Sequence, residues 1–574
     1  MLDRTIKFEN LKEMIEKTVE NFGERTAFYK DGKGLEDSKK ISYKEFMNDI
    51  NSLGTALVEM GLKGKRIAVI GENRYEWELA YLAIVCGAGV VVPLDKALPD
   101  NEIESLIIRS EVEAIFYSNK YDGCMAQIQK EGNTKLKYFI SMDLEKNDFN
   151  KYSQKEIIKK GRELLRNGNK EYLESKINNE EMTIMLFTSG TTNQSKAVML
   201  SQQNICTNVH DIRNVFELDE TDRFLSFLPL HHTFECTVGF LYPLSIGGNI
   251  IFSKGVRHIA DELKNFKITA MICVPVVFEK MYDKLIKTID EKGKLGTVKK
   301  GIKLSNCLLK VGIDIRKKLF KEIHDNLGGC LRVMVAGGAA LSPEKEKGFW
   351  DLGFNVLQGY GLTETSPVIA AELTKQKRLS SIGKKFPSVE VKIDDPDKSG
   401  VGELLAKGKS VMLGYYNNEE ANKEVFTEDG WFRTGDLARI DKDGYLYISG
   451  RKKFVIVLKN GKNVYPEEIE SLLEKSDLIK ECMVFGMPAK DGDVTLSVKV
   501  CYDKDYIKKE FGEIKEEEIK EKIWNWVKEI NKTMPKYKYV KKLLLTDEEL
   551  VKTTTLKIKR NIEMEKIMKN VTEM

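Results

Sequence analysis

Residues 183–196 read TIMLFTSGTTNQSK, and this stretch joins an apolar strand to a polar loop. The apolar part, residues 183–187, is typical of a buried strand. The loop that follows holds one glycine, five hydroxyl side chains and a final lysine, Lys196. Backbone N–H groups and hydroxyls donate hydrogen bonds to phosphate oxygens, and a lysine adds positive charge. The stretch therefore predicts a polyphosphate-binding loop, and a polar hairpin loop without a ligand is the alternative interpretation.

This loop differs from the P-loop of nucleoside triphosphatases in two respects. A P-loop needs glycine before its lysine and Ser or Thr after it, whereas Ser195 and Ala197 flank Lys196. Residues 197–200 also favour a strand, where a P-loop would open a helix. The pattern therefore predicts a strand–loop–strand unit.

Strands and helices alternate on both sides of this unit. Apolar runs at 65–71 and 89–94 flank a helical stretch at 77–85. Further apolar runs lie at 224–228, 250–252, 270–274 and 331–336, with helical stretches after His232 and over 286–323. This alternation predicts an α/β fold with a largely parallel sheet.

Other segments predict secondary structure near the two ends of the chain and a change in strand length after about Gly400. Residues 11–28 have helical spacing, and Ser42 with Glu45 forms a capping box for a helix that runs towards Met60. After about Gly400 the strands become short and are separated by turn signals. A charged helix is expected at 516–531.

A second candidate segment, residues 354–365, reads FNVLQGYGLTET, and a strand is expected at its start, residues 354–357. Its Gly-x-Gly resembles a dinucleotide fingerprint, but Glu364 stands in place of the third glycine. A carboxylate there fits a site where Mg²⁺ bridges phosphates, with a helix cap as the alternative. Tyr360 lies between two glycines, which suits stacking on a base, and its alternative is a packing aromatic. This segment therefore predicts a second part of a nucleotide site.

The composition limits the class of protein. The chain has 574 residues, a length that suggests two or more domains. Its formal net charge is +4, which gives no reason to expect nucleic-acid binding. The nine cysteines are scattered without a C-x-x-C pair, so we expect reduced thiols in a cytoplasmic protein. Residues 84–94 are apolar but far shorter than a membrane span, so we expect a buried strand and its turn there. Transient contact with the inner membrane surface stays open.

With both segments in view, the chain resembles the adenylate-forming superfamily of acyl-CoA synthetases, luciferases and peptide-synthetase adenylation domains. The resemblance runs from Leu11 to Arg560. It is carried in order by the loop at 188–196, LPLHHTFE at 228–235, AGGA at 336–339, GYGLTETSP at 359–367, WFRTGD at 431–436, GRKK at 450–453, NGKNVYPEEIE at 460–470 and KTTTLKI at 552–558. The wording of GYGLTETSP and NGKNVYPEEIE is most similar to bacterial long-chain fatty-acid–CoA ligases.

The resemblance implies a role for each matching position. Lys557, Thr363 and Glu364 would be catalytic, with Lys557 neutralising the acid and the α-phosphate, Thr363 contacting that phosphate and Glu364 holding Mg²⁺. The ATP and AMP contacts would come from the phosphate loop, the adenine slot and the ribose pair, that is, from Thr188, Ser189, Gly190, Thr191, Thr192, Lys196, Gly337, Gly338, Tyr360, Asp436 and Arg451.

His231 and His232 lie in the motif that borders the acyl pocket in the family. We expect His232 to shape the wall of that pocket, and an acid–base role is the alternative. An amino-acid-activating member would need a carboxylate for the substrate amine near here, and Glu235 is the nearby candidate.

The resemblance also implies a domain plan. Residues 1–450 would bind ATP and the acyl group in parallel-rich sheets with flanking helices and a small β-rich subdomain. Residues 451–453 would form a hinge at Lys453, and residues 454–574 a small mobile α+β domain that carries Lys557. Gly461 and Lys462 would line the approach of coenzyme A.

The chain departs from the family pattern in the phosphate loop. Asn193, Ser195 and Ala197 occupy the positions of Gly, Pro and Gly. Asn tolerates left-handed dihedral angles, whereas Ala does so poorly, so the loop's shape is open. Leu556 stands where many members have glycine before the catalytic lysine.

The implied function is ATP-dependent activation of a medium- to long-chain fatty acid as acyl-AMP, with release of pyrophosphate and transfer to coenzyme A. The substrates and cofactors would be the acid, ATP, Mg²⁺ and coenzyme A. Two alternatives remain: a ligase that delivers the acyl group to a carrier-protein thiol, and a nucleotide-binding homologue impaired in catalysis. The oligomeric state is open, a dimer included.

Overall fold

The computed structural model describes residues 7–188, 195–458, 462–488, 494–552 and 557–572. The chain divides into two compact units. The first contains residues 1–390 and 406–432, and the second contains residues 391–405 and 433–574. The turn-rich strands around Gly400 therefore group with the C-terminal region.

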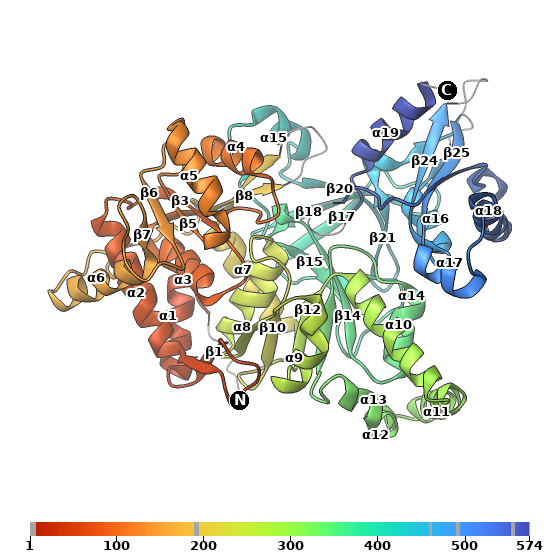
Figure 1. The fold of residues 1–574 in the computed structure, drawn as a ribbon, viewed down its shortest axis with the longest axis horizontal. Coiled ribbons are helices and arrows are strands. Elements are labelled where there is room, and N and C mark those ends of the chain that lie inside the picture. The colour runs from red at the N-terminus through yellow and green to blue at the C-terminus, as the bar shows by residue number, and fades with distance from the viewer. Residues whose placement is uncertain (1–6, 189–194, 459–461, 489–493, 553–556, 573–574) are drawn as a thin grey trace. The chain divides into compact units, whose positions relative to one another are not determined.

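A sheet of nine strands forms one half of the first unit (Figure 1). Its central strands are parallel, and antiparallel strands close both edges. In spatial order, the strands of the described residues are β16 (Lys384–Lys385), β15 (Val368–Ala371), β14 (Val356–Gly361), β13 (Val333–Ala336), β12 (Ala270–Cys273), β10 (Arg223–Ser226), β11 (Asn249–Phe252), β1 (Thr26–Lys30) and β2 (Lys39–Ser42).

A second sheet carries the opening stretch of the sequence. Strands β8 and β9 form an antiparallel pair at one side, and β8 continues into five parallel strands. The order among the described residues is β19 (Gly414–Tyr415), β9 (Lys196–Ser201), β8 (Met182–Thr188), β4 (Gly89–Pro93), β3 (Lys65–Ile70), β5 (Ala114–Tyr117), β6 (Tyr138–Ser141) and β7 (Tyr152–Ser153). The predicted α/β fold with largely parallel sheets and the strand–loop–strand unit are confirmed.

Several helices follow the expected pattern. Ser42 and Glu45 form the predicted capping box of α2 (Tyr43–Glu59). The basic stretch over 286–323 is helical, as expected, and contains the end of α10 (Pro275–Glu291), α11 (Leu295–Leu309), α12 (Arg316–Leu319) and the start of α13 (Lys321–Asn326). The helix α14 (Pro343–Asp351) precedes β14.

Three expected elements differ in their bounds. Helix α1 (Leu11–Phe22) ends early, because residues 26–30 pair with β2 and β11 as strand β1 instead of continuing a helix. Residues 84–88 form a π-helical turn after α3 (Tyr75–Ala83) rather than part of a strand, and Gly87 closes it with φ +146°. Strand β14 starts at Val356, since the Phe354 N–H still bonds to the Phe349 carbonyl at the end of α14.

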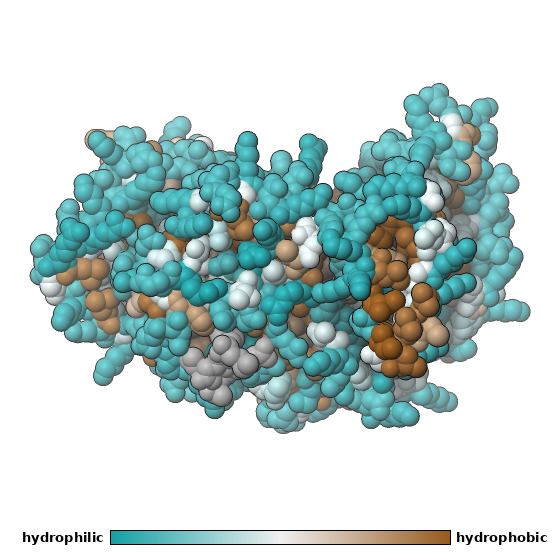
Figure 2. All heavy atoms as spheres, turned by 90° about the horizontal axis from the view of Figure 1, so that it is seen from below, coloured by the Kyte–Doolittle hydropathy of each residue, from teal (hydrophilic) through white to brown (hydrophobic). Residues whose placement is uncertain are grey.

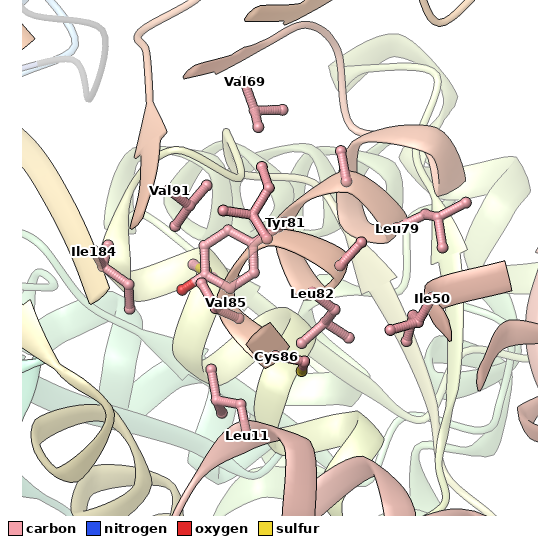
Figure 3. Packing of buried hydrophobic residues seen from close by; sticks show 14 of the residues in the cluster. Leu11, Ile50, Val69, Leu79, Tyr81, Leu82, Val85, Cys86, Val91 and Ile184 are labelled. Atoms are coloured by element: carbon pink, nitrogen blue, oxygen red, sulfur yellow. The ribbon is translucent and has the colours of Figure 1, made fainter. Parts of the chain in front are cut away.

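The α3 segment lies at the centre of the core. Trp77 and Tyr81 are buried and stack with ring centroids 5.6 Å apart. Figure 3 shows Tyr81 and Val85 close to Val91 of β4 and Ile184 of β8. Burying aromatic and aliphatic groups of this size removes a large apolar area from water, at about 25 cal/mol per Å². This packing holds β8 and hence the base of the phosphate loop.

Among the described residues, the second unit holds a two-stranded sheet, β22 (Ile456–Val457) with β23 (Asn463–Val464), and two larger sheets. The first sheet has the order β17 (Val389–Asp394), β18 (Gly402–Gly408), β20 (Phe432–Ile440) and β21 (Leu446–Arg451). The second has the order β24 (Ile479–Pro488), β25 (Val494–Tyr502) and β26 (Lys542–Thr546). Its helices include α16 (Pro466–Leu473), α17 (Lys504–Phe511), α18 (Glu516–Lys532) and α19 (Arg560–Thr572). Helix α18 confirms the charged helix expected at 516–531.

Across the described ranges, none of the helices is both long enough and apolar enough to pass through a lipid bilayer.

Two buried carboxyl groups, those of Glu346 and Glu372, accept hydrogen bonds from strand β14. Gln358 of β14 donates from its backbone N–H to Glu372 at 3.0 Å and from its side-chain amide to Glu346 at 2.9 Å. Both glutamates are fully buried. Burial raises the pKa of both carboxyl groups, and the charge of Glu346 helps to raise the pKa of Glu372 to about 8. At neutral pH the pair therefore holds a proton that the unfolded chain would release.

This proton makes stability depend on pH. The pKa of Glu372 is raised from 4.5 to about 8, so its favourable contribution is complete below 4.5 and is lost as the pH rises to about 8. We expect the free energy of unfolding to fall across this window by up to about 1.4 kcal/mol per pH unit. Glu372→Gln should flatten the slope in urea unfolding measured at several pH values. Glu344→Gln, an exposed change on the same helix as Glu346, should keep the wild-type slope. Equal slopes in both variants would contradict the assignment.

Candidate active site

Several candidate residues of the first unit lie at one edge of the nine-stranded sheet, whereas Thr188 and Lys196 belong to the eight-stranded sheet. Parallel strands point their carboxyl ends to the same edge, where α/β proteins bind ligands. Strand β10 ends at Ser226 before the segment with His231 and His232, and β13 ends before Gly337. Strand β14 runs into the segment that ends with Glu364. Motifs far apart in the sequence are therefore neighbours in the fold.

Gly337 and Gly338 each have a structural reason to be glycine. A Cβ atom on Gly337 would lie 2.7 Å from the Phe234 ring, and Gly338 has φ +84°, which disfavours residues with a side chain. Gly337 is buried and Gly338 is exposed. The backbone here can be approached closely, as an adenine slot requires.

Tyr360 is held in strand β14. Its Cα is paired with Ala370 of β15, and the side chain is half-buried. Gly361 follows because a Cβ atom there would lie 1.8 Å from the Pro367 carbonyl oxygen. The stacking role of Tyr360 stays a prediction.

Thr363 and Glu364 lie in the 3₁₀ turn Thr363–Thr365. Glu364 is not the residue that caps this turn, since Leu362 occupies the N-cap position. The Glu364 carbonyl accepts a hydrogen bond from the Met412 N–H at 2.8 Å. Its carboxylate accepts one from the Tyr415 hydroxyl at 2.9 Å. Glu364 is thus fixed from two sides and keeps a hard oxygen donor of the kind that Mg²⁺ prefers.

Tyr415 connects Glu364 to the phosphate loop. It belongs to β19, beside β9, and the ammonium of Lys196 lies 4.9 Å from the centre of its ring. Thr188 pairs with Lys196 across the β8–β9 hairpin. The positive charge at the end of the loop and the carboxylate at the end of β14 therefore contact the same tyrosine.

Ser189, Gly190, Thr191 and Thr192 lie outside the described residues. The base of the loop is described and has a further partner in Arg109, the basic residue in the last turn of α4 (Asp100–Ser110). Arg109 donates to the Ser195 carbonyl and lies 5.3 Å from the centre of the Phe187 ring. Arg109 thus adds a second positive charge, besides that of Lys196, next to the residues at which the loop begins and ends.

The two histidines form a cluster with Asp95, which directly follows the strand expected at 89–94. The rings of His231 and His232 are 4.2 Å apart, and Nε2 of His231 lies 3.4 Å from the Asp95 carboxylate. One ligand atom of each residue lies within 4.8 Å of the others, so the three could hold a metal ion. Three ligands are one fewer than a closed zinc site needs, and the contact between Asp95 and His231 explains two of them without a metal.

Glu235 does not line an open amine site. It is fully buried, and the Ser226 hydroxyl donates to its carboxylate at 2.7 Å. Burial raises its pKa to about 8, so the group is largely neutral at pH 7. This environment gives no support to an amino-acid substrate.

In the second unit, Asp436 and Arg451 face each other across β20 and β21. Their Cα atoms are register partners, and the Arg451 Nε lies 2.8 Å from the Asp436 carboxylate. Asp436 is buried and Arg451 is half-buried. The resemblance implies that these two residues share a ribose site, which stays a prediction, and the cross-strand register brings their side chains together.

The segment that carries Lys557 is anchored on both sides. Lys552 pairs with Glu481 at 2.5 Å, and the Lys559 N–H donates to the Val551 carbonyl at 2.7 Å. Arg560 binds the buried carboxylate of Glu470. Lys557 itself is exposed. These contacts fix the backbone on both sides of Lys557, while the Lys557 side chain is exposed.

Lys453 follows Gly450 by three residues, and Gly450 packs tightly. Gly450 has φ +148°, and a Cβ atom there would lie 2.8 Å from a carboxylate oxygen of Glu467. Lys453 is exposed in the 3₁₀ turn Lys452–Phe454. Lys462 is exposed too, and its ammonium lies 4.3 Å from the Tyr537 ring centre. Gly461 lies outside the described residues.

Sequence reasoning missed Tyr415, Arg109 and Asp95. Asp95 had a signal, because it follows a buried parallel strand, where polar residues gather at the sheet edge. Tyr415 and Arg109 lie outside any motif, and their contacts depend on elements distant in sequence.

Comparison with known proteins agrees with this geometry. Residues 15–416 match the model of the family described as AMP-binding enzyme, and residues 453–574 match that of the AMP-binding enzyme C-terminal domain. Fatty acyl-CoA synthetase B of Dictyostelium discoideum is 30% identical over 516 residues, covering 83% of this chain and 75% of that protein. The chloroplastic long-chain-fatty-acid–[acyl-carrier-protein] ligase AEE15 of Arabidopsis thaliana is 25% identical over 647 residues, covering 100% and 87%.

The fold also matches a solved structure, the ATP-bound MatB from Rhodopseudomonas palustris, with TM-score 0.75, 23% identity, and 97% and 98% of the two chains covered. The fold and the motifs define an adenylate-forming acid–thiol ligase. The chain belongs to the AMP-binding enzyme family.

Tyr415→Phe tests the contact between β19 and Glu364. Losing a hydrogen bond to a charged group costs about 1.5–3 kcal/mol, so the Mg²⁺ concentration for half-maximal pyrophosphate release should rise about tenfold or more. Tyr416→Phe is the matched control, because its hydroxyl binds Arg66 and Glu111 instead. A magnesium titration of both variants checks this, and a Tyr415→Phe curve that overlays the wild type would refute it.

Proposed function

We propose that this chain activates a medium- to long-chain fatty acid and transfers it to coenzyme A. In the first step a carboxylate oxygen attacks the α-phosphorus of ATP, and pyrophosphate leaves to give acyl-AMP. In the second step the thiol sulfur attacks the acyl carbonyl, the thiol proton is released, and AMP leaves. The contact chain Lys196–Tyr415–Glu364 carries this proposal, because it assembles phosphate-binding groups from two sheets.

The first step brings two anions together, so positive charge must collect around them. Lys196 and the phosphate loop would order the β- and γ-phosphates, and Thr363 would contact the α-phosphate. Glu364 would hold Mg²⁺, which when bound offsets phosphate charge. Lys557 would neutralise the attacking carboxylate and the α-phosphate. Its exposure and its anchored backbone support this role.

The nucleoside contacts that the resemblance implies fall into two groups. Gly337, Gly338 and Tyr360 would form the adenine slot. Asp436 would accept hydrogen bonds from both ribose hydroxyls, and Arg451 fixes the orientation of its carboxylate. Retention of these groups argues against an impaired homologue, since a binder alone would not need Lys557.

Two observations support a fatty acid as the source of the acyl group: the names of the relatives and the apolar core near His232. Both relatives described above act, by name, on fatty acids. Residues 234–241 form a largely apolar π-helical segment beside the histidines, and Glu235 within it gives no accessible charge for an amine. An apolar wall of this kind suits a hydrocarbon chain.

The acceptor thiol has two candidates. One relative is named as a ligase for acyl-carrier protein, and it matches this chain over its whole length. Coenzyme A is favoured by the resemblance of GYGLTETSP and NGKNVYPEEIE to fatty-acid–CoA ligases. A carrier-protein thiol is the second candidate.

A panel of acids and two acceptors tests the proposal. Each buried methylene contributes about 0.8 kcal/mol, so kcat/KM for pyrophosphate release should rise about fourfold per methylene until the pocket is full. Thioester formation is then measured with coenzyme A and with a phosphopantetheine-bearing carrier protein. A profile that peaks at acetate or an amino acid would overturn the substrate, and turnover with the carrier protein alone would overturn the acceptor.

Lys557→Ala and Lys453→Pro separate the two steps. We expect Lys557→Ala to abolish acyl-adenylate formation yet to convert supplied acyl-adenylate and coenzyme A to thioester. Proline at 453 fixes φ near −65° and should slow the second step more than the first if the hinge lies there. Each half-reaction is assayed alone. Equal loss of both steps in both variants would mean that residues 451–453 do not act as a hinge and that Lys557 is structural.

A further inference from the structure

A surface outside the candidate site combines exposed aliphatic side chains with lysines. It consists of α11, α12 and the connection between them, residues 295–319, and we call it the α11–α12 surface. Of the fifteen residues of α11, Ser305 alone is buried. A helix in a globular protein usually buries a full apolar stripe, so this one leaves apolar residues without cover.

The exposed aliphatic residues concentrate here. Seventeen large hydrophobic residues are exposed in the described part of the chain, and five of them fall within residues 304–319. Val311 is 72% exposed and Ile313 51% exposed, and both lie in the connection between the helices. The others are Leu304, Leu309 and Leu319. Figure 2 shows an apolar patch on the face seen from below, over the region where Figure 1 places α11 and α12.

The charge of the same surface is strongly positive. Residues 295–319 hold seven basic residues and one acidic residue, a net charge of +6, whereas the whole chain carries +4 and the remaining residues together −2. Six of the basic residues are exposed lysines, namely Lys299, Lys300, Lys303, Lys310, Lys317 and Lys318. The basic character of the protein is thus concentrated on two short helices.

The surface is also fixed to the body of the first unit. Asn306 of α11 donates to Asp351 of α14 at 3.0 Å, and Arg316 of α12 donates to the Trp350 carbonyl at 2.7 Å. Phe320, which follows α12, is buried. The aliphatic side chains therefore project from an anchored platform.

We propose that the α11–α12 surface docks on an anionic lipid bilayer. Aliphatic side chains surrounded by lysines are the pattern of helices that lie in the membrane interface, where apolar groups enter the acyl region and lysines meet anionic headgroups. Nucleic acid is a poorer partner, because the exposed apolar residues are aliphatic and offer no ring for stacking on bases. This inference goes beyond the proposed reaction and rests on exposure and charge alone.

Sedimentation of the full chain with lipid vesicles tests this docking. We expect binding to vesicles of equal parts phosphatidylglycerol and phosphatidylcholine, and little binding to phosphatidylcholine alone. Reversing three charges in Lys299→Glu/Lys300→Glu/Lys303→Glu should weaken binding at least about a hundredfold, since each lysine near such a surface contributes roughly fivefold. The matched control is Lys130→Glu/Lys159→Glu/Lys160→Glu, three exposed lysines elsewhere in the first unit, which should bind nearly as wild type.

A second pair of variants separates insertion from charge attraction. Val311→Ser/Ile313→Ser should weaken binding about tenfold at constant charge, while Phe149→Ser, at a side chain 98% exposed, should not. Failure of the wild type to sediment with the anionic vesicles at low salt would overturn the proposal. So would equal loss in the two triple variants, or binding that ignores Val311 and Ile313, which would favour an acidic protein as the partner. None of these readouts depends on catalytic activity.

Discussion

The hydrogen bond from Tyr415 to Glu364 joins the two large sheets of the first unit, and the candidate site depends on that junction. Tyr415 belongs to the eight-stranded sheet and Glu364 follows the last parallel strand of the nine-stranded one. The Glu364 carbonyl also binds the backbone at Met412, so the contact is made twice. Because Lys196 lies over the ring of the same tyrosine, a shift of either sheet would separate the carboxylate from the phosphate loop.

The phosphate loop shows how a departure from a family pattern can be structurally neutral. Ala197 stands where the pattern has glycine, but it pairs with Phe187 inside the β8–β9 hairpin. Extended backbone suits alanine, so no left-handed conformation is needed there. Ser195 stands in the proline position, and its carbonyl accepts a hydrogen bond from Arg109. A side chain from α4 thus helps to hold a loop end that proline would stiffen by itself.

Buried carboxyl groups hold two of the candidate segments in place. Glu346 and Glu372 support β14 beneath Tyr360, and Glu470 binds Arg560 three residues after Lys557. Burial raises the pKa of Glu470 to about 7 despite its arginine partner. Removing Arg560 would leave the buried Glu470 carboxylate without its counter-charge, and such a loss typically costs about 3–5 kcal/mol. Such pairs therefore fix the geometry of a segment more firmly than they add to stability.

Sequence alone was enough for the fold class, the alternation of strands and helices, the capping box at Ser42 and the positions of the chemical motifs. These features depend on local periodicity and on short motifs, which are readable without knowledge of contacts. The sequence pattern predicted too long a first helix, because residues 26–30 pair with β11, a strand more than 200 residues away. Tyr415, Arg109 and the carboxyl pair beneath β14 were likewise decided by tertiary structure. Their roles arise from contacts between distant elements and from burial, and neither is encoded in the residues beside them.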